Sequence, residues 1–322
     1  MKAAVVGVDG VRLADVETPS PKPNEILVKV HAASLNRADL AVAAGHRHGA
    51  MGGPGAIPGL EWAGEVVDIG EDVKGLHPGD RVMCSGSGGY AEYAVTDYGR
   101  ASAIPDGMSY ETATTLPLAL QTMHDAIVTN GRLQPGESIL VQGASSGVGL
   151  MALQIARWRG ASVIIGTSTN SERRARLADF GATHSLNTTD PQWPEAVRSA
   201  TGGEGVNLII DQISAPVANG NLHAAAVLGR IVNVGRLGGS KGEFDFDLHA
   251  LKRVSYIGVT FRTRSIEEVR EINRRMRADL WGAVETGVLG LPIDKAFPLA
   301  AAADALAHMQ ANRHFGKILL LP

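Results

Sequence analysis

The first third of the chain contains short runs of hydrophobic residues that alternate with polar ones and end at proline or glycine. Residues 26–30 (ILVKV) follow a proline cluster, residues 65–69 (EVVDI) end at Gly70, and residues 90–95 (YAEYAV) form another alternating run. A period of two is typical of strands with one buried face, and frequent breakers keep such strands short. The pattern therefore predicts an irregular β-barrel or sandwich.

From near Thr112 the pattern changes to short apolar runs separated by segments of helical periodicity. Helices between short apolar strands are typical of βαβ units, which build a parallel sheet. We therefore predict an α/β fold for this part of the chain. The predicted helices cover residues 110–130, 148–159, 171–180, 192–200 and 215–226, and the predicted strands cover residues 138–142, 161–166, 183–186, 206–211, 229–234 and 254–259.

The end of the chain holds two amphipathic helices and one strand. Apolar residues recur at helical spacing in residues 266–276 and 299–309, and residues 316–321 (GKILLL) form a terminal apolar run. Because this last strand has no place in the parallel alternation, we expect it to return to the first domain. A chain of 322 residues is long enough for two domains.

Composition narrows the class of protein. A net charge of −3 and a pI near 6.4 give no electrostatic signature of binding to nucleic acid or to an anionic membrane. The chain has no apolar run of about 18 residues, and residues 1–10 lack the long apolar core of a signal peptide, so we expect a cytoplasmic protein without membrane partners. The single cysteine, Cys84, excludes an intramolecular disulfide and any zinc site built on several cysteines.

A loop of small residues follows the predicted strand 138–142. Residues 141–149 read VQGASSGVG, where the dinucleotide-binding pattern G-x-G-x-x-G has Ala144 and Ser146 in place of its first two glycines. Small residues between a strand and a helix let backbone N–H groups approach a pyrophosphate. Small-residue turns are also common without any ligand, so the loop alone leaves both interpretations open. The candidate phosphate-binding residues are Ala144, Ser145, Ser146, Gly147, Val148 and Gly149.

The end of the next predicted strand indicates which nucleotide is bound. Folds that prefer NAD place an acidic residue there for the ribose 2′-hydroxyl. This chain instead has the hydroxyl residues Thr167, Ser168 and Thr169, followed by Arg173 and Arg174. Hydroxyl and guanidinium groups suit a 2′-phosphate, which favours NADPH over NADH. The alternative is that these arginines form a solvated helix face.

With these residues in place, the chain resembles the medium-chain dehydrogenase/reductase superfamily, and within it the zinc-independent quinone oxidoreductase branch of zeta-crystallin-like proteins. The motifs that carry this resemblance occur in the same order over nearly the whole chain. They are Ser34-Leu35-Asn36-Arg37-Ala38-Asp39, Pro58-Gly59-Leu60-Glu61-Trp62-Ala63-Gly64, Pro78-Gly79-Asp80-Arg81-Val82, Gly143 to Gly149, Phe180-Gly181-Ala182 and Phe315-Gly316-Lys317.

The resemblance implies an α/β protein with two domains. Residues 1–118 and 262–322 are expected to form a GroES-like catalytic domain with an irregular β-barrel. Residues 119–261 are expected to form a Rossmann domain that binds NADP through a doubly wound parallel sheet. Members of this family are commonly dimers, so a homodimer is expected.

The sequence departs from the zinc-dependent relatives at their ligand positions. Those relatives carry a cysteine near residue 36 and a Gly-His-Glu near residue 59, where this chain has Asn36 and Gly59-Leu60-Glu61. We therefore expect no metal site. His46 and His48 lie in a glycine-rich loop, where solvation is the favoured interpretation. The tyrosine and arginine that many quinone reductases carry after the Asn-x-x-Asp element are missing from residues 40–45.

The resemblance also assigns roles to individual residues. Asn36 is the candidate donor to the carbonyl of an acceptor, with capping of a helix as the alternative, and Asp39 is expected to orient the neighbouring turn. Thr122 matches a threonine near the nicotinamide, with a packed helix residue as the alternative. The further candidate cofactor-binding residues are Asn233, Val234, Gly235, Phe315 and Gly316.

These features favour an NADPH-dependent oxidoreductase of the quinone reductase type. Without zinc, oxidation of an alcohol lacks its Lewis acid, whereas a quinone or an α,β-unsaturated carbonyl delocalises the charge that hydride transfer adds. A related alternative is an enoyl-thioester reductase or a zinc-free alcohol dehydrogenase. An alternative of another class is a non-catalytic NADPH-binding protein with a structural or regulatory role.

Overall fold

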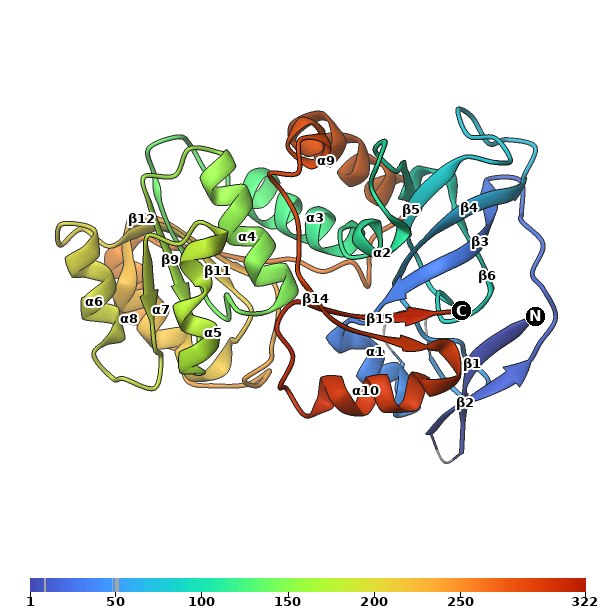
Figure 1. The fold of residues 1–322 in the computed structure, drawn as a ribbon. Coiled ribbons are helices and arrows are strands. Elements are labelled where there is room, and N and C mark those ends of the chain that lie inside the picture. Colours follow the sequence, from blue (N-terminus) through green and yellow to red (C-terminus); the bar gives the residue numbers. More distant parts are fainter. Residues whose placement is uncertain (9, 48, 50–51) are drawn as a thin grey trace. The chain divides into compact units, whose positions relative to one another are not determined.

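The computed structural model describes residues 1–8, 10–47, 49 and 52–322, so His48 lies outside the described residues. The chain forms two compact units (Figure 1). Unit 1 comprises Met1–Leu118 and Phe261–Pro322, and unit 2 comprises Ala119–Thr260. None of the helices in the described residues combines the length and apolar character that crossing a bilayer requires.

Unit 1 is built on a mainly antiparallel sheet whose central strand is β3. Within the described residues its strand order is β14-β15-β3-β4-β5-β7, and β6 also pairs with β3. The separate strands β1 (Lys2–Gly7) and β2 (Gly10–Asp15) form an antiparallel pair. The strands of the sheet are β3 (Glu25–Ser34), β4 (Glu61–Ile69), β5 (Arg81–Ser85), β6 (Tyr93–Asp97), β7 (Ala101–Ala103), β14 (Ile293–Pro298) and β15 (Lys317–Leu321).

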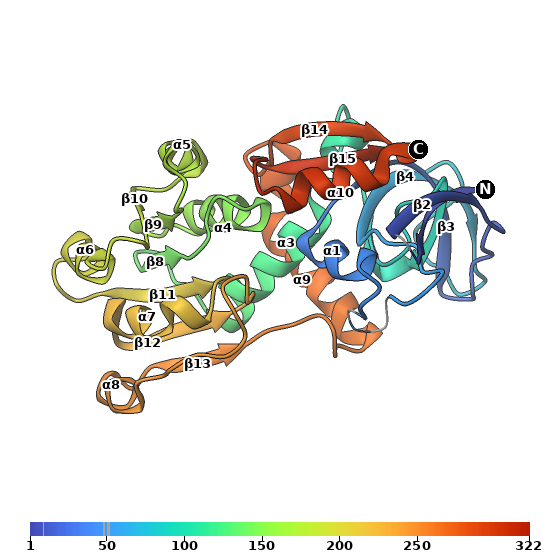
Figure 2. The same cartoon turned by 90° about the horizontal axis from the view of Figure 1, so that it is seen from below.

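The terminal strand returns to the first domain, as the sequence predicts. β15 pairs antiparallel with β3, with Leu319 opposite Ser34, and parallel with β14. Figure 2 shows the helix α10 (Ala302–Gln310) lying along β14 and β15. Leu306 and Met309 of this helix pack into the same core as Trp62, which is fully buried.

Unit 2 contains six parallel strands in the order β10-β9-β8-β11-β12-β13, which Figure 2 shows from top to bottom. This is the strand order of the doubly wound Rossmann fold, in which the chain changes direction between β8 and β11 and ligands bind outside the carboxyl ends of the strands. The strands are β8 (Ser138–Val141), β9 (Val163–Thr167), β10 (His184–Leu186), β11 (Val206–Asp211), β12 (Ala225–Asn233) and β13 (Ser255–Gly258). The predicted α/β fold class, with a GroES-like barrel and a Rossmann sheet, is confirmed.

Helices connect the strands of unit 2 and complete unit 1. All four residues of β8 are buried, as expected for a strand of a sheet covered on both faces. The helices of unit 2 are α4 (Gly147–Trp158), α5 (Ser171–Ala175), α6 (Trp193–Ala200), α7 (Ala218–Ala224) and α8 (Phe246–Lys252), and unit 1 contains α1 (Arg37–Ala43), α2 (Tyr110–Ala113) and α9 (Ile266–Glu285).

Several predicted elements differ from the structure. The predicted helices 171–180 and 215–226 each contain a 3₁₀ segment, Leu177–Phe180 and Ala215–Val217, and residues 225 and 226 belong to β12. The predicted helix 110–130 is divided into α2, α3 (Pro117–His124) and a π-helix, Asp125–Asn130. Pro117 is the first residue of α3, where its missing N–H costs nothing, but it could not lie inside one continuous helix without breaking it. The predicted strand 90–95 begins only at Tyr93, where pairing with β3 begins, because residues 90–92 instead bond to β1 through the single bridge of Ala3 with Ala91.

The pairing of β3 with β4 depends on a glycine. Gly64 lies opposite Val30, and a Cβ at this position would lie against the backbone carbonyl group of Lys29. We predict that Gly64→Ala lowers the free energy of unfolding by about 1–3 kcal/mol, because the backbone of β3 must shift to make room.

Thermal unfolding followed by circular dichroism measures this effect as a lower Tm. The matched control is Gly282→Ala in α9, where an added Cβ meets nothing within 4 Å. This control should gain about 0.5–1 kcal/mol from helix propensity. Equal Tm values for the two variants would contradict the prediction.

Candidate functional site

Strand register in unit 1 brings three distant segments to one point. Ser34 at the end of β3 lies opposite Glu61 at the start of β4. On the other edge of β3, Ser34 lies opposite Leu319, which places Lys317 at the start of β15 beside the turn that follows β3. The backbone N–H of Leu35 donates to the carbonyl of Ile318 at 2.9 Å and holds this register. Asn36 lies in that turn, directly before α1.

The carboxylate of Glu61 is fully buried and surrounded by donors. Its Oε1 accepts from Lys317 Nζ at 2.5 Å, Ser34 Oγ at 2.6 Å and Asn36 Nδ2 at 2.9 Å. Its Oε2 accepts from the backbone N–H of Leu118 at 2.8 Å. A buried charge is stable only when it is paired and fully hydrogen-bonded, and Glu61 meets both conditions.

Asn36 combines a capping position with a polar side chain held in the cluster. It is the N-cap residue of α1, and its backbone N–H donates to Asp39 Oδ2 at 2.8 Å. Its side-chain Oδ1 accepts from Lys317 Nζ at 3.0 Å, while Nδ2 donates to Glu61. Asn36 is half-buried, whereas Ser34 and Glu61 are fully buried. Of these three residues, Asn36 is the one that is not fully buried.

Asp39 is a second buried carboxyl group, behind Asn36. Besides the Asn36 N–H, its Oδ2 accepts from the hydroxyl of Tyr90 at 2.8 Å, and within the described residues Oδ1 has no partner. Burial raises the pKa of Asp39 to about 6, against the opposing effect of the hydrogen bonds from Tyr90 and Asn36. Burial likewise raises the pKa of Tyr90, and the neighbouring carboxyl of Asp39 raises it further.

In unit 2, the loop after β8 is packed tightly against the first turn of α4. Gly143 adopts a left-handed φ of 70°, and Ser146 caps α4 by accepting from the N–H of Gly149 at 3.1 Å. A Cβ on Gly149 would lie 2.6 Å from the Gly143 oxygen and 2.7 Å from Ala144. Small residues are therefore required at this close approach of loop and helix.

The first turn of α4 offers free donors. Within the described residues, the N–H groups of Gly147 and Val148 have no acceptor in the protein, as is normal at the start of a helix. These N–H groups and the helix dipole favour an anion here. The loop Ala144–Gly149 therefore fits a pyrophosphate.

The hydroxyl of Thr167 supports the loop from within. It is buried, donates to Gln142 Oε1 at 2.8 Å and accepts from the N–H of Gly143 at 3.0 Å. Ser168 Oγ is 3.0 Å from Ser145 Oγ, which joins the end of β9 to the loop. The Thr167 hydroxyl is thus bonded within the protein, and its contact with the cofactor stays a prediction.

The remaining residues of this segment lie nearer the surface. Thr169 is exposed, and Arg173 and Arg174 are half-buried. Arg174 Nη1 donates to the backbone oxygen of Ser168 at 2.9 Å, so its guanidinium is anchored at the end of β9. Two cationic groups thus follow a strand end that carries no acid.

The turns after β11 and β12 close this edge of the sheet. Asn233 Nδ2 donates to Ser214 Oγ at 2.6 Å, and Ser214 Oγ donates to the Gly235 oxygen at 2.7 Å. The N–H groups of Val234 and Gly235 both donate to the backbone oxygen of Asp211. Gln212 accepts from Ser146 Oγ at 3.1 Å, so the turn after β11 is tied to the loop after β8. Segments far apart in the sequence therefore meet at the carboxyl ends of β8, β9, β11 and β12.

The other candidate residues have different surroundings. Thr122 is half-buried on α3. The N–H of Phe315 donates to Asp294 Oδ1 at 3.0 Å, and Gly316 has a left-handed φ of 93° against the backbone of Pro292. Phe315 and Gly316 thus shape the turn that delivers Lys317.

The described residues contain no group of three histidine, cysteine or acidic side chains placed to hold a metal ion. The side chains near residue 36 are also a poor set of zinc ligands. An amide stands at Asn36, an alkyl side chain at Leu60, and the Glu61 carboxylate is bound to the ammonium of Lys317. These groups do not fit a zinc site.

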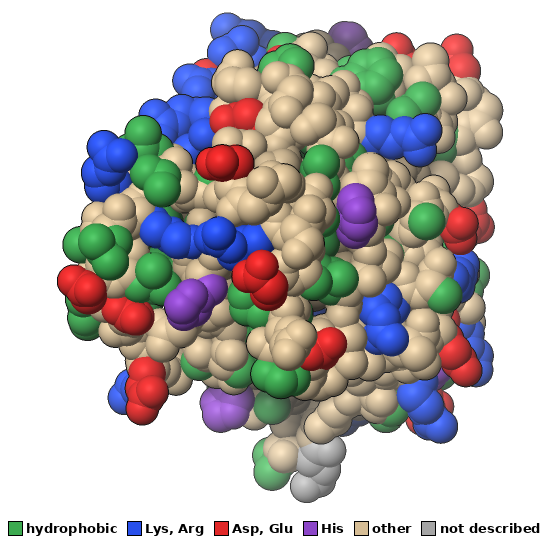
Figure 3. All heavy atoms as spheres, turned by 90° about the vertical axis from the view of Figure 1, so that its left-hand side faces the viewer, with side chains coloured by type: hydrophobic (Ala, Val, Ile, Leu, Met, Phe, Trp, Pro, Cys, Tyr) green, Lys and Arg blue, Asp and Glu red, His purple; other side chains and the backbone are tan. Residues whose placement is uncertain are grey.

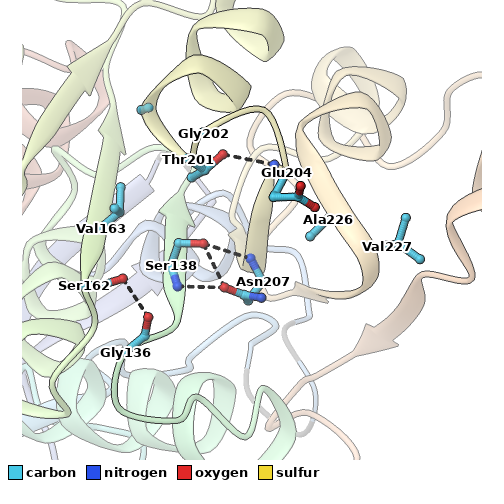
Figure 4. A pocket seen from close by; sticks show the side chains of 12 residues that line it. Gly136, Ser138, Ser162, Val163, Thr201, Gly202, Glu204, Asn207, Ala226 and Val227 are labelled. Atoms are coloured by element: carbon cyan, nitrogen blue, oxygen red, sulfur yellow. Dashed lines mark hydrogen bonds between the residues drawn. The ribbon is translucent and has the colours of Figure 1, made fainter.

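A pocket of about 520 Å³ lies at the opposite, amino-terminal end of the parallel strands. In Figure 4 the Ser138 hydroxyl bonds to the side chain of Asn207, and the Ser162 hydroxyl donates to the backbone oxygen of Gly136. Glu204 lines its exposed rim. The pocket lies at the other end of the strands from the loop after β8, so we do not assign it to the nucleotide.

Several residues of the cluster are not among the site residues that the sequence predicts. Glu61 and Lys317 belong to motifs that carry the family resemblance, but no role was assigned to either. Lys317 offers a signal of its own, because it is a single cation at the start of an apolar run. The alternating pattern of residues 90–95 predicts that Tyr90 is a strand residue, yet its hydroxyl binds Asp39. In unit 2, no local sequence pattern predicts that the side chain of Gln212 bonds to Ser146 in the loop after β8.

Comparison with known proteins supports the architecture. Residues 22–106 match the family described as alcohol dehydrogenase GroES-like domain, and residues 147–277 match the family described as zinc-binding dehydrogenase. Quinone oxidoreductase of Sus scrofa is 30% identical over 313 residues, covering 96% of this chain and 92% of that protein.

Two further relatives are informative. A mycocerosic acid synthase-like polyketide synthase of Mycobacterium tuberculosis is 30% identical over 93% of this chain, which spans 14% of that protein. A mycobacterial protein solved in complex with NADPH superposes with a TM-score of 0.88 at 26% identity, with full coverage of both chains.

The two matched domains and the Rossmann sheet define the class, the medium-chain dehydrogenase/reductase superfamily. Within that superfamily, the chain belongs to the family of the quinone oxidoreductases. The resemblance on which the sequence analysis relied is confirmed.

The buried carboxyl of Asp39 gives a pH-dependent stability. Its pKa rises from the usual 3.8 to about 6 on folding. Between these values the unfolded chain has released the proton while the folded protein retains it, so the contribution of Asp39 to stability falls as the pH rises from about 4 to about 6. We predict that Asp39→Asn, which does not titrate, lacks this decline of up to about 3 kcal/mol.

Urea unfolding at a series of pH values measures the effect as the difference in free energy of unfolding between the natural protein and Asp39→Asn. The exposed Asp304→Asn on α10 is the matched control for the substitution itself. A constant difference for Asp39→Asn across this pH window would refute the assignment.

Proposed function

We propose that the protein is an NADPH-dependent oxidoreductase that transfers hydride to a quinone or an α,β-unsaturated carbonyl without zinc. The observation that carries this proposal is the cluster around Glu61. The Glu61 carboxylate is bound to the Lys317 ammonium. The member of the cluster that is not fully buried is Asn36, whose side chain is a neutral amide. A neutral donor suits the oxygen of a conjugated carbonyl, which delocalises the charge that hydride addition brings.

The cofactor proposal rests on the loop and strand ends of unit 2. The free N–H groups of Gly147 and Val148 would hold the pyrophosphate. The exposed Thr169 and the half-buried Arg173 and Arg174 would hold the 2′-phosphate, beside a strand end that itself carries no acidic residue. The similarity to a protein solved with NADPH supports this choice. Asn233, Val234 and Gly235 are proposed beside the nicotinamide, and Phe315 and Gly316 are proposed as further cofactor contacts.

When bound, NADPH supplies the hydride, and the residues of this chain position and polarise the acceptor. Asn36 would donate a hydrogen bond to the acceptor oxygen, where negative charge develops. Asp39 would fix the turn that carries Asn36 by accepting its backbone N–H, which it does at 2.8 Å. Thr122 is proposed as a contact to the nicotinamide.

A second candidate is reduction of an α,β-unsaturated thioester. The similarity to a segment of a polyketide synthase favours it. The acceptor in that case presents the same conjugated carbonyl, so the same residues would serve. A role as a zinc-free alcohol dehydrogenase or as a non-catalytic NADPH-binding protein predicts no reduction of any conjugated acceptor.

We also propose a cytoplasmic homodimer. The short strand β13 lies at the edge of the sheet of unit 2, and Phe246, Leu251 and Tyr256 on α8 and β13 are exposed apolar or aromatic side chains that a partner could cover. On the face that Figure 3 shows, hydrophobic side chains are interspersed with charged ones of both signs.

We predict turnover of NADPH with quinones or enones, and a fall in kcat of about 10- to 100-fold in Asn36→Ala, because one donor to the developing charge is lost. Oxidation of NADPH followed by its absorbance, with a panel of quinones, enones, enoyl thioesters and aldehydes, measures both. Asn24→Ala, at an exposed position of unit 1, is the matched control and should keep full activity. No turnover with any conjugated acceptor would overturn the proposal.

The cofactor assignment is tested separately from turnover. We predict that Arg173→Ala and Arg174→Ala each lower the ratio of NADPH to NADH affinity by about tenfold, because a charge-assisted contact to the 2′-phosphate is lost. Fluorescence titration with each cofactor gives the two Kd values. Arg176→Ala, exposed just beyond α5, should leave the ratio unchanged. An unchanged ratio in all three variants would refute the assignment.

A further inference from the structure

We propose that Lys317 and Glu61 are positioning residues that hold the Asn36 amide in one orientation, with one N–H left for the acceptor. This inference rests on the proposed function, in which Asn36 donates to the carbonyl of the acceptor. It adds that the orientation of that donor is set by a buried ion pair whose cation is delivered by the last strand of the chain.

The three side chains form a closed triangle of hydrogen bonds. Lys317 Nζ donates to Glu61 Oε1 at 2.5 Å and to Asn36 Oδ1 at 3.0 Å, and Asn36 Nδ2 donates to the same Glu61 oxygen at 2.9 Å. Turning the amide by 180° would place its NH₂ against an ammonium and its oxygen against a carboxylate. Both contacts would be repulsive, so the triangle permits one orientation of the amide.

This orientation leaves one donor uncommitted. The Nδ2 group of Asn36 has two hydrogens, and one is directed to Glu61. For the other, the described residues provide only the backbone oxygen of Ser34, at a long distance of 3.5 Å. The ammonium against Oδ1 also polarises the amide and strengthens its remaining N–H as a donor.

Packing alone does not require a buried ion pair at this position. Lys317 is 5% exposed and Glu61 is fully buried, and burying two charges carries a desolvation cost that an apolar pair of similar size avoids. Ser34 and the N–H of Leu118 complete the shell of Glu61, so the carboxylate itself cannot swing away. A role in fixing the neighbouring Asn36 amide explains why an ion pair is buried here.

A double-mutant cycle between Lys317 and Asn36 tests the inference. We expect Lys317→Met to lower kcat for a quinone about tenfold while leaving the NADPH Kd unchanged, because the amide is then free to turn away from the acceptor. In the Asn36→Ala background the same substitution should lower kcat by less than about twofold. Lys317→Arg, which keeps the cation, should retain most of the activity.

The controls separate folding from positioning. Lys295→Met, at an exposed position on the neighbouring β14, should have no effect. If Lys317→Met does not fold because Glu61 is left unpaired, Glu61→Gln/Lys317→Met removes both charges and takes its place in the cycle. It should fold and show the same loss of kcat, again absent without Asn36.

The outcomes distinguish the inference from the function on which it rests. An equal fall in kcat in the natural and Asn36→Ala backgrounds would mean that Lys317 acts independently of Asn36, which overturns the positioning role but not the function. Full activity of Asn36→Ala would overturn the role of Asn36 as donor, and the inference with it. An increase in KM alone, with kcat unchanged, would also overturn the positioning role.

Discussion

The fully buried carboxylate of Glu61 is the constraint on which the organisation of the site in unit 1 depends. A charge in that position must be surrounded by donors, and these come from the end of β3, the first turn of α3 and the start of β15. Lys317 follows Glu61 by 256 residues in the chain. One side chain therefore links three segments that the sequence separates widely, and the pairing of β15 with β3 is what makes this possible.

In unit 2, neutral groups hold the candidate cofactor-binding loop in place. The loop after β8 is held by the hydroxyl of Thr167, the hydroxyl of Ser146 and the amide of Gln212, each bonded to the backbone or to another neutral side chain. The carboxyl of Asp211, buried at the end of β11, accepts from the backbone N–H groups of Ile213 and Ser214. The ligand that the loop fits is an anion. The helix N-terminus then supplies the complementary partial charge.

The sequence predicts the fold well where local pattern decides it. Alternation of apolar strands and amphipathic helices is enough to identify the parallel sheet, and an apolar run without a partner predicts the return of β15. The predicted helix 110–130 fails at Pro117, because periodicity alone does not register a missing N–H. Tyr90 was misjudged for a related reason: its alternating neighbours suggest a strand, while its hydroxyl bonds to a carboxyl 51 residues away in sequence.

The same division explains which parts of the site could be predicted. Asn36 and the loop Ala144–Gly149 are recognisable because a short motif contains them. The contact between Glu61 and Lys317 depends on strand register, which no local pattern specifies. That contact also decides the chemistry available at Asn36. Since the cation is committed to Glu61, the accessible group is an uncharged amide, which suits a carbonyl oxygen and would hold a phosphate or carboxylate poorly. In the proposed function, the buried pair would thus limit the kind of acceptor as well as the orientation of its donor.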